Sequence, residues 1–171
     1  MSTPIALTSC HLRHLRIIHF QSHMTDSNAY FMLQALQLGK QVKNKTGDNP
    51  WVGCVIVNNG QVLGEGYTHA VGGPHAEADA IQHAEAQGYS LVGSTLYCTV
   101  EPCSFSGRTP SCAKTIVEKK ISHVCLAIRD PHPQVNGEGI QILKAGGIRI
   151  TEGIEEIAVR RSLETWLKVY E

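Results

Sequence analysis

The sequence reads Val52-Gly53-Cys54-Val55-Ile56-Val57-Asn58-Asn59-Gly60 at the point that decides its fold. The first six residues form a continuous apolar run, which predicts a strand buried on both faces, as in a sheet covered by helices. Asn59-Gly60 is a strong signal for a two-residue hairpin turn, because both residues accept the positive φ angles of that turn. We therefore expect Gln61–Tyr67 to return antiparallel to the first strand.

Helical and strand patterns alternate along the rest of the chain. A first helix is expected before the hairpin, over residues 28–43, where apolar side chains recur at helical spacing. Two further helices are expected over His75–Ala86 and Gly137–Ala145, and another should start at Thr109-Pro110. A C-terminal helix should carry Leu163, Trp166, Leu167 and Tyr170 on one face. The other expected strands are Leu96–Val100, Val124–Ile128 and Ile148–Thr151. This alternation predicts that the later strands are parallel and joined by right-handed crossovers. The chain should therefore be an α/β protein, with one mixed five-stranded sheet in a three-layer α/β/α sandwich.

Length and charge narrow the class of partner. A chain of 171 residues suits one domain with a substantial core. Its 15 basic residues balance its 15 acidic ones, whereas a general polynucleotide binder needs an excess of positive charge on one face. There is no run of 18 apolar residues, so no membrane span is expected. These features favour a small-molecule substrate over nucleic acid or a membrane.

Six cysteines raise the question of disulfide bonds. Cys54, Cys98 and Cys125 lie inside apolar, strand-like runs, where cysteine usually packs as a small hydrophobic residue. No convincing signal peptide precedes them. We therefore expect free thiols in a reducing cytoplasm rather than a secreted, disulfide-bonded domain.

The beginning of the chain differs in composition from the remainder. Its first 25 residues contain no acidic side chain, and four histidines fall within residues 10–23. A metal-binding tail or a targeting segment is conceivable there, but a disordered extension over residues 1–23 is the simpler interpretation. Asp26 or Ser27 can cap the helix that follows. We expect one folded domain over residues 24–171.

The chemistry is concentrated in His75-Ala76-Glu77, Pro102-Cys103 and Cys112. One imidazole and two thiolates make three zinc ligands, and a catalytic zinc keeps its fourth position for water, whereas a structural zinc has four protein ligands. His75 and Cys112 stand at expected helix starts and Cys103 follows a strand, so the three can meet beyond the carboxyl ends of the strands. The positive ends of two helices would also favour thiolate over thiol.

Glu77 is expected to carry protons rather than to bind the metal. Residues i and i+2 of a regular helix point about 200° apart, so His75 and Glu77 do not converge on one atom. Zinc lowers the pKa of a bound water to about 7. A carboxylate near the metal can take that proton and deliver protons to a ring nitrogen and to departing ammonia. The pattern therefore favours hydrolytic deamination of an aromatic ring.

Each part of this pattern also has a simpler interpretation. A His-x-Glu triplet is frequent by chance, and Cys103 and Cys112 could form a structural pair or a disulfide. Taken together, the residues match the H-x-E…P-C-x-x-C signature of zinc deaminases. The difference is that eight residues, not two, separate the cysteines.

With this spacer, which contains Gly107-Arg108-Thr109-Pro110, the sequence resembles the deaminase domain of the bifunctional riboflavin biosynthesis protein. The resemblance extends from about residue 24 to about residue 153. It also includes Asn49-Pro50-x-Val52-Gly53-Cys54-Val55, Glu101-Pro102-Cys103-Ser104 and Asp130-Pro131-x-Pro133-Gln134-Val135-x-Gly137. It implies a cytidine deaminase-like fold, and the spacer separates the chain from cytidine, cytosine, guanine and tRNA adenosine deaminases.

The resemblance implies a specific reaction and a set of site residues. The reaction is hydrolysis of 2,5-diamino-6-(5-phosphoribosylamino)pyrimidin-4(3H)-one to 5-amino-6-(5-phosphoribosylamino)uracil and ammonia. The zinc ion is implied to bind His75, Cys103 and Cys112, with Glu77 as proton carrier and Asn49 as a hydrogen-bonding partner of the substrate. A guanidinium suits phosphate by its planar fork of donors. Further candidates for substrate contact are Arg108, Thr109, Asp130 and His132.

Two departures from the family leave other functions open. Phe105 stands where the family usually has histidine. We also expect no reductase domain of the kind that follows in the bifunctional protein. A paralogous deaminase of another small aminopyrimidine or nucleobase is one alternative. A non-catalytic, zinc-stabilised binding module is another, against which the intact Glu77 argues. Arg108 could equally pack within its loop and His132 face solvent. Related deaminases generally assemble, so we expect a homodimer.

Overall fold

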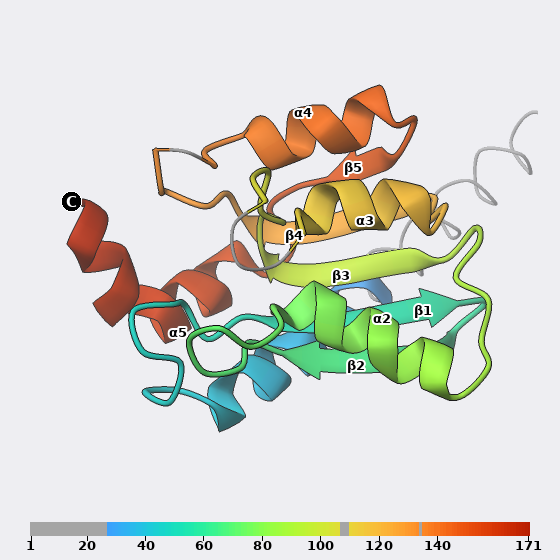
Figure 1. Cartoon of the computed structure of the whole chain (residues 1–171). Helices are drawn as coiled ribbons and strands as arrows, with labels where there is room; N and C mark the ends of the chain where they lie inside the picture. The colour runs from blue at the N-terminus through green and yellow to red at the C-terminus, as the bar shows by residue number, and fades with distance from the viewer. Residues whose placement is uncertain (1–26, 107–109, 134) are drawn as a thin grey trace, which may run out of the picture.

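The computed structural model describes residues 27–106, 110–133 and 135–171, which form an α/β fold around one central sheet (Figure 1). The sheet has five strands in the order β2-β1-β3-β4-β5. Their bounds are Gly53–Asn58 for β1, Gln61–Tyr67 for β2, Thr95–Val100 for β3, His123–Ile128 for β4 and Arg149–Thr151 for β5. The predicted mixed five-stranded sheet is confirmed.

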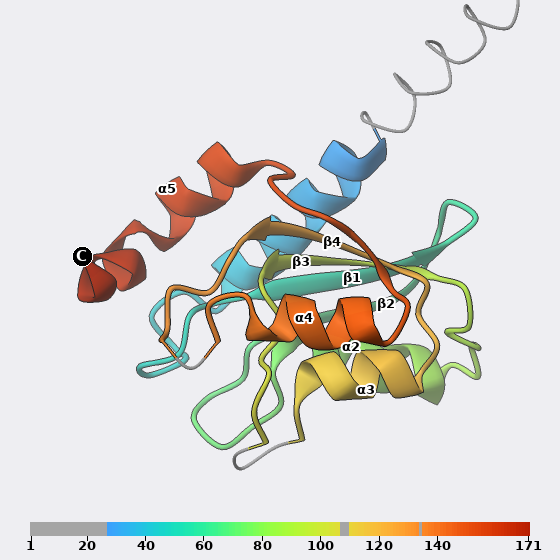
Figure 2. The same ribbon diagram turned by 90° about the horizontal axis from the view of Figure 1, so that it is seen from above.

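Helices cover both faces of this sheet. One face carries α2 (Ala76–Ala86), α3 (Cys112–Glu118) and α4 (Glu138–Ala145), and the other carries α5 (Glu156–Leu167) and the first described helix, residues 27–41 (Figure 2). The core lies between the layers, where Met32 and Leu163 from one helical layer and Ile116 from the other are almost fully buried. The three-layer sandwich is therefore as predicted.

The strand directions bring the site residues to one edge. β1 is antiparallel to both β2 and β3, whereas β3, β4 and β5 are parallel to one another. The hairpin turn lies where expected, with positive φ at Asn59 (50°) and Gly60 (78°). Because β3 and β4 are parallel, the loops after Val100 and Ile128 leave the sheet at the same edge.

The close approach of α2 to β2 depends on Gly66. A Cβ atom at this position would lie 2.3 Å from the carbonyl oxygen of Ala76 and 2.3 Å from the amide nitrogen of Ala80. Any side chain at Gly66 would therefore push α2 away from the sheet. The first turn of α2 carries Glu77, so this contact between glycine and helix helps to place the candidate proton carrier.

Two helix boundaries differ from the prediction. α3 begins at Cys112 rather than at Thr109-Pro110, because the Ser111 hydroxyl caps the helix and accepts a hydrogen bond from the Lys114 amide at 3.3 Å. The C-terminal helix ends at Leu167 and tightens into the 3-10 turn η1 (Lys168–Tyr170). Tyr170 is therefore 38% exposed instead of continuing the buried face of the helix.

Other expectations concern cysteines, membranes and the start of the chain. The cysteines of the described ranges are all free and buried, as predicted for Cys54, Cys98 and Cys125. Within the same ranges, no helix has the length and apolar character needed to cross a membrane. The expected extension over residues 1–23 lies outside the described residues.

Candidate metal centre and substrate pocket

His75, Cys103 and Cys112 meet at the edge of the sheet where β3 and β4 end. His75 is the N-cap of α2, Cys112 is the first residue of α3, and Cys103 lies three residues beyond β3. The His75 Nδ1 atom lies 3.6 Å from the Cys103 sulfur and 3.6 Å from the Cys112 sulfur. All three donor atoms lie within 4.8 Å of one another. Two helix starts and one strand end thus present three donors to one point.

The spacing of these donors fits zinc. In a tetrahedral site with Zn–N of about 2.0 Å and Zn–S of about 2.3 Å, a nitrogen and a sulfur ligand lie about 3.5 Å apart. The two nitrogen–sulfur distances of 3.6 Å agree with that value. One histidine and two cysteines are also the protein ligands of a zinc site that keeps a position for water. The residues present therefore fit a catalytic zinc ion.

Backbone hydrogen bonds hold the two cysteine segments together. The Cys112 amide donates to the Cys103 sulfur at 3.3 Å. The Cys103 carbonyl oxygen accepts from the Ser111 hydroxyl at 3.0 Å and from the Ala113 amide at 3.1 Å. Ser111 thus caps α3 and also links it to the Cys103 loop. Sequence reasoning missed Ser111, although a serine directly before a helix start is a recognisable cap.

The surroundings of Cys103 favour its thiolate. Hydrogen bonds from Cys112 and His75 lower the pKa of the Cys103 thiol to about 4, although burial opposes the shift. The hydrogen bond between Cys112 and Cys103, together with burial, raises the pKa of the Cys112 thiol. The hydrogen bond to Cys103 raises the pKa of His75. The pocket therefore provides a thiolate, which is the form that binds zinc.

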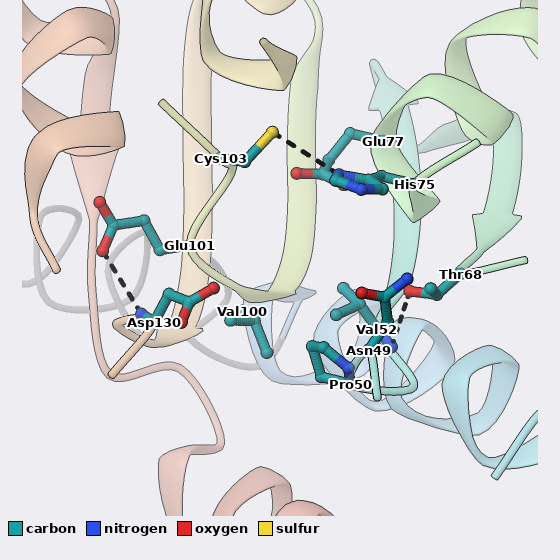
Figure 3. Close-up of a pocket in the computed structure, with 10 residues that line it drawn as sticks. All are labelled: Asn49, Pro50, Val52, Thr68, His75, Glu77, Val100, Glu101, Cys103 and Asp130. Atoms are coloured by element: carbon teal, nitrogen blue, oxygen red, sulfur yellow. Dashed lines mark hydrogen bonds between the residues drawn. The ribbon is translucent and has the colours of Figure 1, made fainter. Parts of the chain in front are cut away.

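Glu77 is buried beside these donors without being one of them. Its side chain is 4% exposed and lines the same pocket as His75 and Cys103 (Figure 3). Burial raises the pKa of the Glu77 carboxyl to about 7, and the negative charge at Cys103 adds to the shift. A carboxyl group that titrates near neutral pH can both take up and release a proton. Glu77 therefore has the environment of a proton carrier.

The pocket beside the donors carries a polar side chain on each of two opposite sides. Figure 3 shows Asn49 on one side and Asp130 on the other. The residues that line it are Asn49, Pro50, Val52, Thr68, His75, Glu77, Val100, Glu101, Cys103 and Asp130. Burial raises the pKa of the Asp130 carboxyl. Two of the candidate substrate contacts, Asn49 and Asp130, thus line the same pocket as the donors His75 and Cys103.

Two buried threonines hold the Asn49 side of the pocket. The Thr46 hydroxyl donates to the Asn49 carbonyl oxygen at 2.6 Å, and Thr46 is 1% exposed. The Thr68 hydroxyl accepts from the Val52 amide at 3.1 Å. Neither threonine belongs to a sequence motif, so only the folded arrangement reveals its role.

The remaining candidates are placed differently. His132 does not line the pocket formed by the described residues; its amide donates to the Asp130 carboxylate at 2.8 Å, and its ring lies 6.1 Å from that of Tyr170. Arg108 and Thr109 lie outside the described residues. Phe105 is 45% exposed and is not among the residues that line this pocket.

Known proteins resemble this chain in sequence and in fold. Residues 25–128 match the family model described as the cytidine and deoxycytidylate deaminase zinc-binding region. The riboflavin biosynthesis protein RibD of Chlamydia pneumoniae is 39% identical over 143 residues, which cover 84% of this chain and 37% of that protein. The structure of Acinetobacter baumannii RibD matches with a TM-score of 0.81 and 41% identity, over 86% of this chain and 41% of that one.

A third match names two activities. It is a Thermotoga maritima protein described as a diaminohydroxyphosphoribosylaminopyrimidine deaminase and 5-amino-6-(5-phosphoribosylamino)uracil reductase. That structure matches with a TM-score of 0.80 and 35% identity, over 86% of this chain and 42% of that one. The present chain thus spans about two fifths of the length of these relatives.

Proposed function

The chain belongs to the cytidine and deoxycytidylate deaminase zinc-binding family, and on that premise we propose that it deaminates a riboflavin precursor. The proposed reaction converts 2,5-diamino-6-(5-phosphoribosylamino)pyrimidin-4(3H)-one and water into 5-amino-6-(5-phosphoribosylamino)uracil and ammonia. The observation that carries the proposal is the three-donor cluster of His75, Cys103 and Cys112 with the buried Glu77 beside it. The similarity to RibD proteins supports the choice of substrate.

In this proposal His75, Cys103 and Cys112 hold the zinc ion. Zinc bound there would supply a water acidic enough to lose its proton near neutral pH. Glu77 takes up that proton and delivers it to the ring nitrogen. It then carries a second proton, lost by the hydroxyl group added to the ring carbon as the carbonyl forms, to the amino group that leaves as ammonia. The pKa of about 7 that burial gives the Glu77 carboxyl suits both directions of transfer.

The polar side chains on the two sides of the pocket would orient the pyrimidine. Asn49 offers an amide donor and acceptor from one side, and Asp130 offers a carboxyl from the other. Within the described residues, no Lys or Arg lines the pocket. We therefore assign the phosphate to Arg108 and Thr109, the candidates that the resemblance implies. His132 is assigned to the rim of the pocket rather than to contact with the pyrimidine.

The direct test is ammonia release by the purified chain loaded with zinc. We expect turnover of the diaminopyrimidine phosphate and at least about 100-fold lower kcat/KM for cytosine and guanine, because those bases lack the ribose phosphate that the site would hold. About one zinc per chain should be found by elemental analysis. Turnover of cytosine or guanine in preference to the diaminopyrimidine would contradict the substrate assignment, and absence of bound zinc would contradict the whole proposal.

The proposal also covers the oligomeric state of the protein and the compartment in which it acts. We expect a homodimer that acts on a small molecule and does not bind nucleic acid. The balance of 15 basic and 15 acidic residues supports the last point. The free cysteines of the described ranges support a reducing compartment such as the cytoplasm. Light scattering after size exclusion would distinguish the dimer from a monomer of 18.7 kDa.

A further inference from the structure

Glu101 makes a set of hydrogen bonds that the proposed chemistry does not use. It follows β3 directly and precedes the ligand Cys103 by two residues, and its side chain is 4% exposed. One of its carboxylate oxygens accepts from the Gly137 amide at 3.0 Å and from the Ile140 amide at 3.2 Å. The other accepts from the Gly137 amide at 2.9 Å. It also accepts from the Asp130 amide at 3.4 Å, the contact that Figure 3 marks with a dashed line.

These bonds cap α4 from another part of the chain. The N-cap residue of α4 is Gly137, with φ of 95°, and no side chain of its own segment caps the helix. The first amides of a helix have no partner within the helix, and a negative charge there is stabilised by the helix dipole. The buried Glu101 carboxylate supplies both the acceptor and the charge.

A steric contact keeps α4 tight against the metal-binding loop. A Cβ atom on Gly139 would lie 2.0 Å from the Pro102 carbonyl oxygen and 3.1 Å from a Glu101 carboxylate oxygen. The first turn of α4 therefore packs directly on the residues that precede Cys103. Glu101 thus joins the ligand loop to the segment from Asp130 to Ile140.

We propose that Glu101 is a positioning residue that fixes this segment as one wall of the substrate pocket. Through the segment it holds Asp130 opposite Asn49, while Asp130 in turn accepts a hydrogen bond from the His132 amide. Glu101 itself takes no part in proton transfer or metal binding. The expected effect of Glu101 on substrate binding rests on the proposed function, whereas its effect on the position of the segment does not.

The kinetic test compares Glu101→Ala and Glu101→Gln with Glu138→Gln. Glu138 is an exposed acid in the first turn of α4, so its variant controls for loss of a negative charge at the same helix end. We expect Glu101→Ala to raise KM for the diaminopyrimidine phosphate about 10-fold or more, with a smaller change in kcat and about one zinc retained. Glu101→Gln should be intermediate, because its amide oxygen can still accept from Gly137 while its NH₂ group cannot. Glu138→Gln should equal wild type.

Hydrogen exchange on the zinc-loaded protein without substrate tests the wall independently. Glu101→Ala and, less strongly, Glu101→Gln should speed amide exchange over residues 130–140, and Glu138→Gln should not. If Glu101→Ala does not fold, Glu101→Gln carries both tests. Unchanged exchange and an unchanged KM in the Glu101 variants would overturn the proposal, as would loss of zinc as their main effect. If the wild-type protein does not turn over the diaminopyrimidine but amide exchange is still faster in the Glu101 variants, only the proposed function is refuted. Glu101 would then still be the residue that anchors the wall.

Discussion

The two sides of the pocket are built in different ways. On the metal side, His75 and Cys112 take their places from the starts of α2 and α3, so regular helix geometry sets the donors. On the opposite side, Asn49 and Asp130 stand on loops, and each loop is held by a buried side chain, Thr46 or Glu101. The difference suggests that helix starts position the metal donors, whereas hydrogen bonds from buried side chains position the residues that face the substrate. Substitutions on the two sides should therefore fail in different ways.

The largest effect is expected from removing a metal donor. Cys112→Ser should bind zinc far more weakly and lose ammonia release to the detection limit, because serine is a poor zinc ligand at neutral pH. Zinc content and activity, measured on the same sample, check this. Cys125→Ala is the control, since Cys125 is also fully buried but lies outside the donor cluster. A Cys112→Ser protein with full zinc content would contradict the assigned ligand set.

The next largest effect should separate proton transfer from metal binding. Glu77→Gln keeps the shape of the side chain but cannot accept the proton, so kcat should fall about 10²–10⁴-fold. Zinc content should stay near one per chain, because Glu77 does not belong to the donor cluster. Elemental analysis beside steady-state kinetics distinguishes the two effects. A variant with normal turnover would remove Glu77 from the mechanism.

A smaller effect is expected on the substrate side from Thr46→Val. This change removes the hydroxyl bonded to the Asn49 carbonyl while preserving shape, so KM should rise about 5-fold with little change in kcat. Thr115→Val is the matched change on the metal side, where it deletes a similar bond from a hydroxyl to the Ser111 carbonyl. Because the backbone bonds of α3 remain, it should leave KM and kcat within about 2-fold of wild type. Equal effects of the two variants would argue against the contrast between the walls.

The smallest effect is expected from Phe105→His, which restores the residue usual in the family. Phe105 is 45% exposed and does not line the described pocket, so KM for the diaminopyrimidine phosphate should change by less than about 3-fold. Steady-state kinetics with that substrate and with cytosine measures the change. A large gain in kcat/KM would show that Phe105 narrows the substrate range and would favour a different natural substrate.

Local patterns were sufficient to predict the sheet and the metal side. The apolar run after Trp51 and the Asn59-Gly60 turn produced β1 and its hairpin as expected, because strand burial and turn geometry depend on neighbouring residues. The three candidate donors could be picked out because each follows a strand or begins a helix, and the structure brings their donor atoms within 4.8 Å of one another. The start of α3 was misplaced because Pro110 and Ser111 offer competing start signals, and the serine cap prevails.

The supports of the substrate side could not be predicted in this way. Glu101 was noticed only as part of a motif, because its partners Gly137 and Ile140 are 36 and 39 residues away. The role of Thr46 depends on which loop atom its hydroxyl meets, and no periodicity encodes that. The residues with the clearest motifs were thus found from the sequence, whereas those that position them required the fold.

Because the Glu101 hydrogen bonds join residues far apart in the sequence, they can form only late in the synthesis of the chain. Every candidate metal donor lies before the end of α3 at Glu118, so a growing chain contains the complete donor set at that point. The partners of Glu101 near the start of α4 are synthesised later. Domains generally fold as units, and contacts distant in sequence form slowly. The candidate donors are therefore all present in the chain before the segment that Glu101 anchors has been made.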